Sequence, residues 1–491
     1  MKSQEGVATI AHTLIRKHAE AQRITVTIVN DRDFSLLVED DGHGYDPEEL
    51  LKSIEAETLA SAIRKAAAGA NILRKLNLTS RVQVAIVKPD TMNSYQTESP
   101  MTSHAHSFAP LKIRGRSLLP IVQGGMGVGI SAHRLAGSVA REGAVGTIAS
   151  IDLRHHHEDL LAMCREDHSR PTLERANLIA LAREIRAARE LSQGRGMIAV
   201  NVMKAVSAHA DYVRVACDEG ANAIVMGAGL PLDLPDLTAG RDIALIPILS
   251  DSRGVTLVLK KWMKKGRLPD AIVIEHPAHA GGHLGVAAVA DMHDERFGFE
   301  RVLTELDASF AALGLKREDV PVIVAGGINS HEAVRKWLAA GANGVQIGTP
   351  FAVTEEGDAH PDFKRVLVEA TPDDIVEFVS VTGLPARAVK TPWLMRYLRN
   401  EERIRTKIGA RKQTCPSALE CLSACGLRDG IEKFGHFCID TRLAAALRGD
   451  VGNGLFFRGR EKLPFGAAIR SVRDLIELLL TGATKASPAS C

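Results

Sequence analysis

The chain is poor in aromatic residues, in cysteine and in long apolar runs, and each shortage excludes a class of protein. Phe, Trp and Tyr make up only 4% of the 491 residues, so Ala, Val, Leu and Ile must build the core. Seven cysteines are too few for a disulfide scaffold. No apolar run reaches the length of a membrane span, and the first residues lack the apolar centre of a secretory signal. We therefore expect a cytoplasmic protein.

Neither sign of charge is in excess. Lys and Arg number 61 and Asp and Glu 59, which gives a net charge of +2. This balance argues against nucleic acid or an acidic membrane as a partner. The chain does contain 42 glycines, several of which directly follow short apolar runs. A glycine-rich loop after an apolar strand is typical of phosphate-binding sites.

Changes in composition divide the chain into segments. We predict an N-terminal extension over residues 1–91 and a polar linker over 92–110. A barrel is expected over residues 111–370 and a mostly helical subdomain over 371–483. Residues 484–491 read as a frayed tail.

The predicted barrel rests on eight short apolar runs, rich in β-branched residues, as expected of parallel strands buried on both faces. The runs are Leu118–Gln123, Ala144–Ala149, Met197–Val202, Ala223–Met226, Ile243–Leu249, Ala271–Ile274, Val320–Ala325 and Gly344–Ile347. Helical patterns separate most of them, most clearly over Thr172–Leu191 and Ser330–Ala340. Eight such units match an α/β fold of the (β/α)8 TIM barrel type. An open doubly wound sheet is the alternative, but glycine motifs follow several strands rather than only the first.

Two glycine loops follow the seventh and eighth predicted strands. Gly326 and Gly327 follow Ala325, and Gly348 and Thr349 close the eighth strand. In TIM barrels these loops commonly bind a phosphate through backbone N–H groups, and glycine is needed because a Cβ would block the anion. The residues favour a phosphate site over a pair of plain turns.

A third glycine loop, Gln123-Gly124-Gly125-Met126, follows the first strand. It could be a dinucleotide fingerprint, but the second strand ends in Ser150 rather than in an acidic residue. In a barrel this loop would lay flat backbone against a planar ring, which favours a flavin over a nicotinamide.

Histidines gather after the sixth strand, where Glu275 is followed by His276, His279 and His283. A zinc site is one interpretation, but the spacing is irregular and rich in glycine. We favour one working histidine, His283, acting as a base or as a hydrogen-bond donor at neutral pH. His276 and His279 are expected to pack or to face solvent, and the run 155–157 to lie on a solvated surface.

The motifs PIVQGGMGVGIS, VNVM, AIVIEHPAHAGGHLG, VIVAGGI and GANGVQIGTPF occur in this order. Together they resemble the FMN-dependent nitronate monooxygenase (2-nitropropane dioxygenase) family. The resemblance spans roughly Ile113 to Leu480 and includes FCIDTRLAAALRGDVGNGLFF near the end. It implies that His283 is catalytic. It also implies a set of FMN-contacting residues: Gln123, Gly124, Gly125, Met126, Asn201, Glu275, Gly281, Gly282, Ala325, Gly326, Gly327, Gln346, Gly348 and Thr349.

The resemblance further implies that the enzyme oxidises alkyl nitronates with O2 to a carbonyl compound and nitrite. The partners would be a small-molecule nitronate and O2, without nucleic acid or membrane, and a homodimer is one option for assembly. An NAD(P)H-dependent reductase of quinones or enoyl thioesters is the alternative, because the same barrel carries that chemistry. A third hypothesis is a signalling protein in which the barrel senses the redox state of a flavin and the N-terminal segment relays it.

Four of the seven cysteines, Cys415, Cys421, Cys425 and Cys438, fall within 24 residues. Four thiolates can bind zinc or an iron–sulfur cluster, but no C-x-x-C pair is present. We favour free cysteines that pack in a core and assign no metal ligand.

The N-terminal extension resembles fragments of two signalling families. VEDDGHGYDPEE, with Asp40, Gly42 and Gly44, is similar to the adenine-contacting box of a sensor histidine-kinase ATPase domain, although Leu14 stands where that family has an Asn. The following segment, LLKSIEAETLASAIRKAAAGA, is similar to the end of a response-regulator receiver domain. Each fragment lacks its active residue, which indicates a fused remnant.

Overall fold

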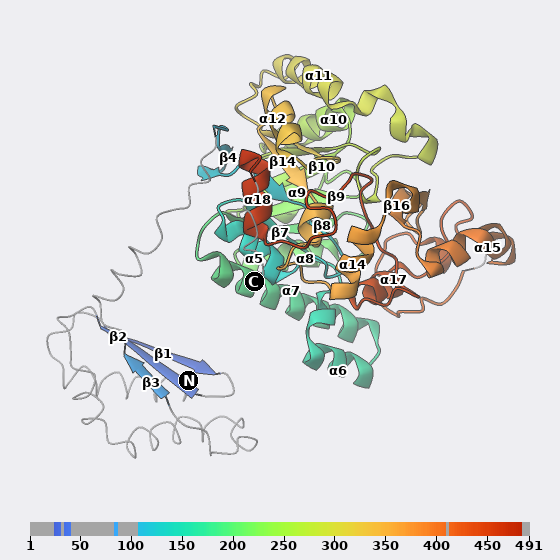
Figure 1. Cartoon of the computed structure of the whole chain (residues 1–491), viewed down its shortest axis with the longest axis horizontal. Coiled ribbons are helices and arrows are strands. Elements are labelled where there is room, and N and C mark those ends of the chain that lie inside the picture. Colours follow the sequence, from blue (N-terminus) through green and yellow to red (C-terminus); the bar gives the residue numbers. More distant parts are fainter. Residues whose placement is uncertain (1–23, 31–33, 41–82, 87–106, 409–411, 484–491) are drawn as a thin grey trace, which may run out of the picture. The chain divides into compact units, whose positions relative to one another are not determined.

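The computed structural model describes residues 24–30, 34–40, 83–86, 107–408 and 412–483 (Figure 1). Contacts divide the chain into two compact units, 1–103 and 104–491, and the division falls inside the predicted linker 92–110. In the first unit β1 (Ile24–Asn30) pairs antiparallel with β2 (Phe34–Asp40), which pairs parallel with β3 (Gln83–Ile86). The rest of the kinase-like and receiver-like segments, and the tail 484–491, lie outside the described residues.

The second unit contains a closed barrel of eight parallel strands. Every predicted strand is present, in chain order around the barrel, so the predicted TIM-barrel fold is confirmed. The strands are β6 (Ile121–Gln123), β7 (Val145–Ala149), β8 (Met197–Met203), β9 (Ala223–Gly227), β10 (Ala244–Leu249), β11 (Ile272–Glu275), β13 (Val322–Ala325) and β14 (Gly344–Ile347).

Helices separate the strands and continue into the C-terminal region. The barrel-segment helices are α5 (His133–Arg141), α6 (Glu158–Glu166), α7 (Arg170–Ser192), α8 (His209–Asp218), α9 (Leu234–Leu237), α10 (Ser252–Met263), α11 (Phe299–Ala312), α12 (His331–Ala339), α13 (Thr349–Ala352) and α14 (Pro361–Glu369). The C-terminal ones are α15 (Pro392–Ile408), α16 (Gly426–Asp429), α17 (Ile439–Leu447) and α18 (Val472–Thr481). The two clearest helical patterns in the sequence correspond to α7 and α12, and Ser330 caps α12 by accepting a hydrogen bond from the Ala333 N–H.

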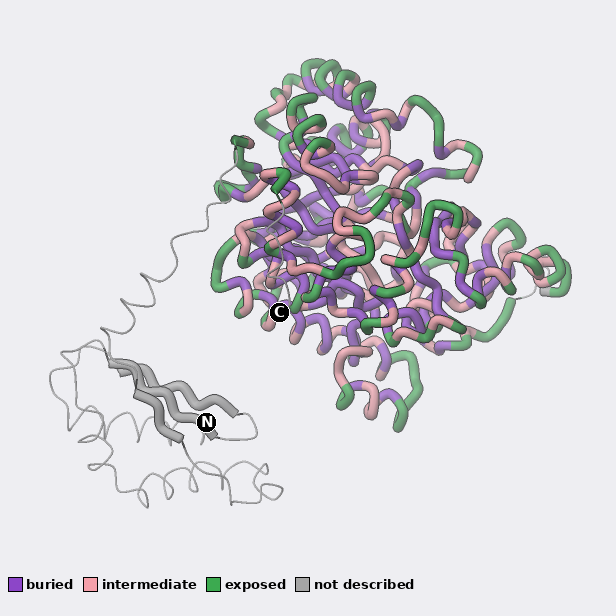
Figure 2. Tube along the Cα trace, in the orientation of Figure 1, coloured by how far each residue is buried: buried purple, intermediate pink, exposed green. Residues whose placement is uncertain are grey.

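The strands bury both of their faces, which explains their continuous apolar runs. Alternate residues such as Val145, Val225 and Val273 point into the barrel and form a small inner cluster. Their neighbours, among them Ile148 and Ile224, pack outward against the helices in a much larger cluster. Figure 2 shows the barrel strands as a buried centre with exposed segments around it.

A hairpin absent from the prediction completes the barrel core. Strand β4 (Leu111–Ile113) pairs antiparallel with β5 (Arg116–Leu118). Its side chains Leu111, Ile113 and Leu118 belong to the inner barrel cluster and are buried. Leu111 lies beside Gly344, the first residue of β14. The hairpin therefore covers the end of the barrel opposite the carboxyl ends of the strands.

The C-terminal region differs from the mostly helical subdomain that was predicted, because it also contains two strands. Strand β15 (Ile375–Val379) pairs antiparallel with β16 (Pro385–Val389). Strand β16 also pairs with β12 (Gly282–His283), which lies in the loop after β11. The region thus shares a sheet with a barrel loop, and residues 104–491 form a single unit.

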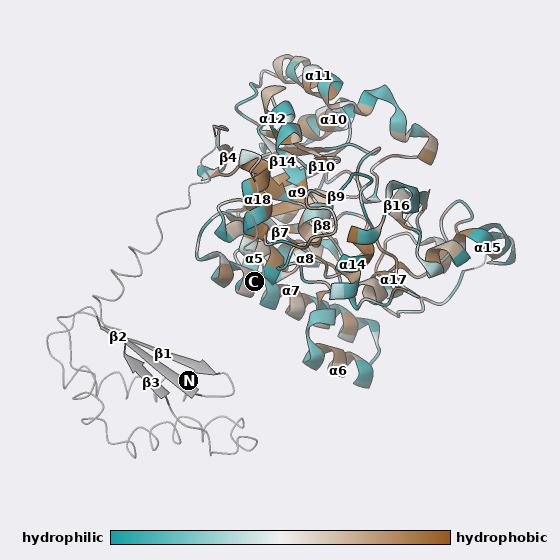
Figure 3. Ribbon diagram, viewed as in Figure 1, coloured by the Kyte–Doolittle hydropathy of each residue, from teal (hydrophilic) through white to brown (hydrophobic). Residues whose placement is uncertain are grey.

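Most residues of α15, at the edge of this unit, are hydrophilic (Figure 3). Its sequence carries a run of charged residues, RNEERIRTK, after an apolar start. None of the helices in the described part of the chain combines the length and the apolar character needed to cross a bilayer.

Candidate active site

The carboxyl ends of the barrel strands surround a cavity of about 680 Å³. Cavities of this size hold cofactors and other small molecules. The loops after β6, β8, β11, β13 and β14 line it, together with parts of the C-terminal region. All but one of the site residues expected from the sequence are among its lining residues: Gly124, Gly125, Met126, Asn201, Glu275, Gly281, Gly282, His283, Ala325, Gly326, Gly327, Gln346, Gly348 and Thr349.

Gln123 is the expected residue that does not line the cavity. Its side chain is fully buried at the end of β6. The side-chain oxygen accepts a hydrogen bond from the Thr147 N–H at 2.8 Å, and the amide donates to the Gly124 carbonyl. Gln123 therefore holds the glycine loop from behind, whereas the sequence had placed it beneath a bound ring.

Close packing requires glycine at position 125 of the first loop, and Gly124 lies close to a neighbouring side chain. A Cβ at Gly125 would come 2.3 Å from the Cβ of Asn201, a distance that no real side chains adopt. A Cβ at Gly124 would come 3.4 Å from the Cγ of Gln346. The loop therefore presents bare backbone to the cavity, with the amide side chains of Asn201 and Gln346 directly beside it. A flat surface of this kind fits a planar ring.

The loops after β13 and β14 form a second cradle. Gly326 and Gly327 have φ values of +105° and +76°, in the left-handed region that favours glycine. Gly348 precedes the short helix α13, and the Thr349 hydroxyl accepts a hydrogen bond from the Gly459 N–H at 3.0 Å. Backbone without side chains at this position of a barrel suits a phosphate group.

His283 is held over the cavity by the C-terminal region. It lies in β12, opposite Ala386 of β16. Its Nε2 is 2.9 Å from the Oγ of Ser380, whose side chain is fully buried. The ring also meets that of Phe457 edge-on, with the centroids 5.7 Å apart. These contacts fix the orientation of the imidazole.

Burial lowers the pKa of His283 to about 4, so the imidazole is neutral at neutral pH. A neutral imidazole offers one N–H donor and one nitrogen acceptor. Sequence reasoning found His283 but missed Ser380 and Phe457. No spacing rule marks either residue, because only the pairing of β12 with β16 brings them to the histidine.

Glu275, the last residue of β11, places a second titratable group in the cavity. Burial raises its pKa to about 7. The carboxyl is therefore about half protonated at neutral pH, and it can act as a hydrogen-bond donor or as an anion.

The other two histidines of this loop have different surroundings. His276 packs edge-on against Phe299 with 5.3 Å between the ring centroids, in line with a packing role. His279 lies at the cavity wall, with Nδ1 2.9 Å from an oxygen of Glu461. In the part of the chain that the structure describes, no three His, Cys, Asp or Glu side chains are grouped so as to hold a metal ion.

The histidine run 155–157 corrects a prediction, because it is not a solvated surface. Burial, followed by the charge of Arg154, lowers the pKa of His155 to about 4. The Nε2 of His156 lies 2.8 Å from the Gly129 carbonyl, and the Nε2 of His157 lies 3.0 Å from Glu184. All three are half-buried, since the run follows β7 and contacts the Gly129 carbonyl and Glu184 of α7.

A buried acid pair at the cavity wall was not found from the sequence. Asp152 accepts hydrogen bonds from Arg154 and from Asn177, the latter at 2.9 Å. Asp440 of α17 interacts with Asp152, and both carboxyls are buried and line the cavity. Burial, followed by the negative charge of Asp152, raises the pKa of Asp440 well above its usual range. Burial and Asp152 therefore favour the neutral form of the Asp440 carboxyl, while Arg154, 3.7 Å away, favours the charged form.

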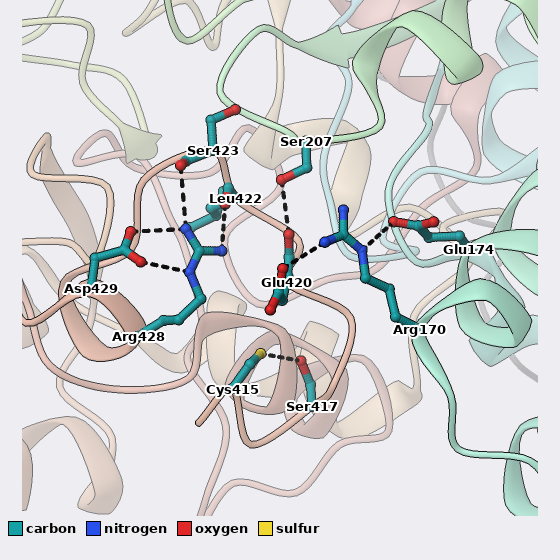
Figure 4. Close-up of polar contacts among 10 residues, drawn as sticks. All are labelled: Arg170, Glu174, Ser207, Cys415, Ser417, Glu420, Leu422, Ser423, Arg428 and Asp429. Carbon is teal, nitrogen blue, oxygen red and sulfur yellow. Dashed lines mark hydrogen bonds and ion pairs between the residues drawn. The ribbon is translucent and has the colours of Figure 1, made fainter. Parts of the chain in front are cut away.

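The four clustered cysteines surround a separate small void of about 20 Å³. All are free thiols, and burial raises the pKa of Cys421 and of Cys425. Figure 4 shows how the segment is held: Arg428 binds Asp429 and the carbonyls of Leu422 and Ser423. Raised thiol pKa values are typical of unreactive, packed cysteines.

Comparison with known proteins gives a consistent family assignment. The family model described as nitronate monooxygenase matches residues 114–482. A protein of Bacillus subtilis (strain 168), described as a probable nitronate monooxygenase, is 28% identical over 291 residues, which cover 56% of this chain and 77% of that protein. A dehydrogenase of a hydroxy-methyl-oxo-octahydroindene carboxyl-CoA from Mycobacterium tuberculosis is 25% identical over 272 residues, 55% of this chain and 63% of that protein.

Among solved structures, FabK from Thermotoga maritima shares the fold with a TM-score of 0.52 at 21% sequence identity. The superposition covers 74% of this chain and 91% of that one. At this identity the likeness concerns the fold alone.

Proposed function

Because the chain belongs to the nitronate monooxygenase family, and is thus an oxidoreductase, we propose that it binds FMN and oxidises alkyl nitronates with O2 to a carbonyl compound and nitrite. The observation that carries the proposal is the convergence on one cavity of two glycine cradles and one neutral, oriented histidine. The cradles suit the two ends of a flavin mononucleotide, and the histidine lies where a small substrate would meet the ring.

The residues present fit FMN. The backbone of Gly124, Gly125 and Met126, beside Asn201 and Gln346, would receive the isoalloxazine, since a Cβ at Gly125 would remove Asn201 from its place. The loops with Gly326 and Gly327, and with Gly348 and Thr349, would hold the phosphate. When bound, FMN supplies the electron-accepting ring and the means of passing electrons to O2.

The part played by His283 follows from its neutrality. With Nε2 engaged by Ser380, the imidazole is locked in one orientation. The other ring nitrogen can orient the nitro group of a bound nitronate by donating a hydrogen bond. When a neutral nitroalkane binds instead, an unprotonated imidazole can accept the proton from the carbon beside the nitro group. The two roles use opposite tautomers: to donate, the other nitrogen carries the proton while Nε2 accepts from the Ser380 hydroxyl, and to act as a base it is bare while Nε2–H donates to the Ser380 oxygen.

Replacement of His283 by Ala tests the proposal. We expect turnover of a neutral primary nitroalkane to fall by at least a hundredfold, because positioned proton transfer contributes about 10²–10⁴-fold. The purified variant should keep its bound FMN, measured by visible absorbance, because the glycine cradles are untouched. Loss of FMN along with activity would make His283 structural, and full activity would remove it from the mechanism. A wild-type protein that takes up no FMN would refute the proposal itself.

A second function is the NAD(P)H-dependent reduction of a quinone or an enoyl thioester, and one relative is described as a dehydrogenase of a carboxyl-CoA thioester. The two functions differ in what reduces the flavin. Under anaerobic conditions a nitronate alone should bleach the visible flavin absorbance of the proposed monooxygenase. Rapid bleaching by NADH, without a nitronate, would favour the reductase.

A further inference from the structure

Part of the cavity wall that the C-terminal region contributes is apolar, beside the polar side chains of Asp440, Arg458, Glu461 and Lys462. Leu422, Leu443, Leu455 and Phe457 line it, together with Leu384 of the turn between β15 and β16. Leu422 and Leu455 are buried at 2% and 0% exposure, while Leu443, Leu384 and Phe457 are half-buried. None of these residues belongs to the glycine cradles assigned to FMN.

This wall is continuous with the reacting end of the site. Phe457 touches His283 edge-on, with the ring centroids 5.7 Å apart. Phe457 also packs against the hydrophobic cluster that contains Leu422 and Leu455, and Leu443 of α17 packs against the same cluster. An apolar surface therefore begins beside the imidazole and extends to α17.

We propose that the wall formed by Leu384, Leu422, Leu443, Leu455 and Phe457 binds an unbranched apolar chain of the substrate, so that the natural substrate is a nitronate with a medium-length alkyl chain rather than the smallest nitroalkanes. The inference rests on the proposed function for the nitronate group and adds the substrate class. A small polar substrate would leave the exposed apolar surface of the half-buried members, Leu384, Leu443 and Phe457, without a partner, and burial of apolar surface is the main source of affinity in such pockets. Leu443 is the specificity-determining residue, since it lines the cavity from α17 and is half-buried.

Binding of unreactive chain analogues to the FMN-loaded, full-length protein tests the proposal without turnover. Linear carboxylates from propanoate to decanoate present a planar anion like that of a nitronate, and their Kd can be measured by calorimetry. We expect Kd to fall by up to about fourfold per added methylene, equivalent to ~0.8 kcal/mol, and to level off when the wall is covered. A Kd that does not change with chain length would overturn the proposal.

Variants at Leu443 locate the chain. Leu443→Trp should lower the chain length at which Kd levels off, because the larger ring fills part of the cavity. Leu443→Ala, which removes apolar contacts without adding bulk, should reduce the gain in affinity per methylene for the longer chains. Leu257→Trp is the matched control, since Leu257 lies on α10 outside the cavity lining and is 40% exposed. If Kd depends on chain length in both Leu443 variants as it does in the wild type, the wall does not bind the chain.

Nitronate turnover separates this inference from the proposed function. Turnover of nitronates together with a flat carboxylate series would refute the apolar-chain site and leave the proposed function intact. A steep carboxylate series without nitronate turnover would refute the proposed function and keep the site, with another acyl or alkyl compound as its substrate. A rise of kcat/KM along a series of nitronates would support both.

Discussion

Two titratable residues of the cavity owe their protonation states to burial rather than to a charged partner. Desolvation raises the pKa of Glu275 to about 7 and lowers the pKa of His283 to about 4. Between these values both groups are predominantly neutral. Near pH 6, Glu275 and His283 therefore add little charge to the cavity that would receive an anionic substrate.

Glu275 should produce a pH dependence that a matched variant removes. As pH rises through about 7, Glu275 ionises and places a negative charge in the cavity that receives the nitronate. A like charge ~10 Å away at an effective dielectric of ~20 costs about 1.7 kcal/mol, so kcat/KM should fall roughly fifteen- to twentyfold. Glu275→Gln should keep the low-pH value up to pH 9. Steady-state kinetics from pH 5 to 9 measures this, and a fall that persists in the variant would assign it to another group.

Asp440 should lower the stability of the fold as pH rises. Its pKa is raised in the folded protein, whereas an unfolded Asp titrates near 3.9. Above that value folding must keep a proton that the unfolded chain releases, so the free energy of unfolding falls with pH until the folded pKa is reached. Asp440→Asn removes this cost. Relative to wild type, its free energy of unfolding should therefore increase with pH, by up to ~1.4 kcal/mol per pH unit above pH 4.

Denaturant unfolding at pH 5 and pH 7 measures this difference, with Asp152→Asn as the contrasting variant. Asp152 is the charged partner of buried Arg154, so its loss should lower the free energy of unfolding by about 3–5 kcal/mol at pH 7. An Asp440→Asn variant that is destabilised equally at both pH values would show that Asp440 is ionised in the folded protein.

At the scale of elements, the pairing of β12 with β16 positions His283. The loop after β11 is rich in glycine, and two residues of β12 alone could not fix His283. Arg387 of β16 reinforces the pairing from a fully buried position. Its guanidinium binds Glu377 of β15 at 2.8 Å and donates to the carbonyls of Pro277 and Ala280 in the loop itself.

Arg387→Met should therefore affect both stability and catalysis. The variant leaves the Glu377 carboxylate and two loop carbonyls without their donor, and we expect a loss of about 3–5 kcal/mol in the free energy of unfolding. In the fraction that stays folded, kcat should fall because His283 is no longer held. Arg387→Lys keeps the charge but not the fork of donors, so its losses should be smaller. Denaturant unfolding and kinetics on the same samples measure both effects, and an Arg387→Met variant with unchanged kcat would separate the loop anchor from catalysis.

At the scale of the whole molecule, the two compact units divide between residues 103 and 104. The second unit contains the complete barrel, the hairpin of β4 and β5 that covers one end of it, and every residue of the candidate site. A unit with its own core is expected to fold alone.

Removal of residues 1–103 should therefore leave the chemistry in place. We expect the shortened protein to bind FMN, to unfold within a few degrees of the full-length Tm, and to keep kcat/KM within about twofold. Thermal unfolding and nitronate turnover measured side by side check this. Insolubility, or loss of FMN from the shortened protein, would show that the N-terminal unit contributes to the fold of the barrel.

The sequence by itself determined the barrel and the loops of the site. Short β-branched runs can be buried on both faces only in a parallel arrangement, and glycines after several strands meet only if the sheet closes. The residues after β6, β11, β13 and β14 were therefore identifiable from local pattern, and they do line one cavity.

Only the tertiary structure decided what surrounds those loops. Ser380, Arg387 and Phe457 reach His283 or its loop from more than ninety positions away along the chain, through a two-residue strand that has no periodicity to read. Three further features likewise depend on which elements pack together. They are the burial of Gln123, the burial of the histidine run 155–157 and the acid pair of Asp152 with Asp440. Local pattern fixes which face of a strand is buried, whereas the neighbour that covers it, and thus the pKa of a buried group, is set by packing across the whole molecule.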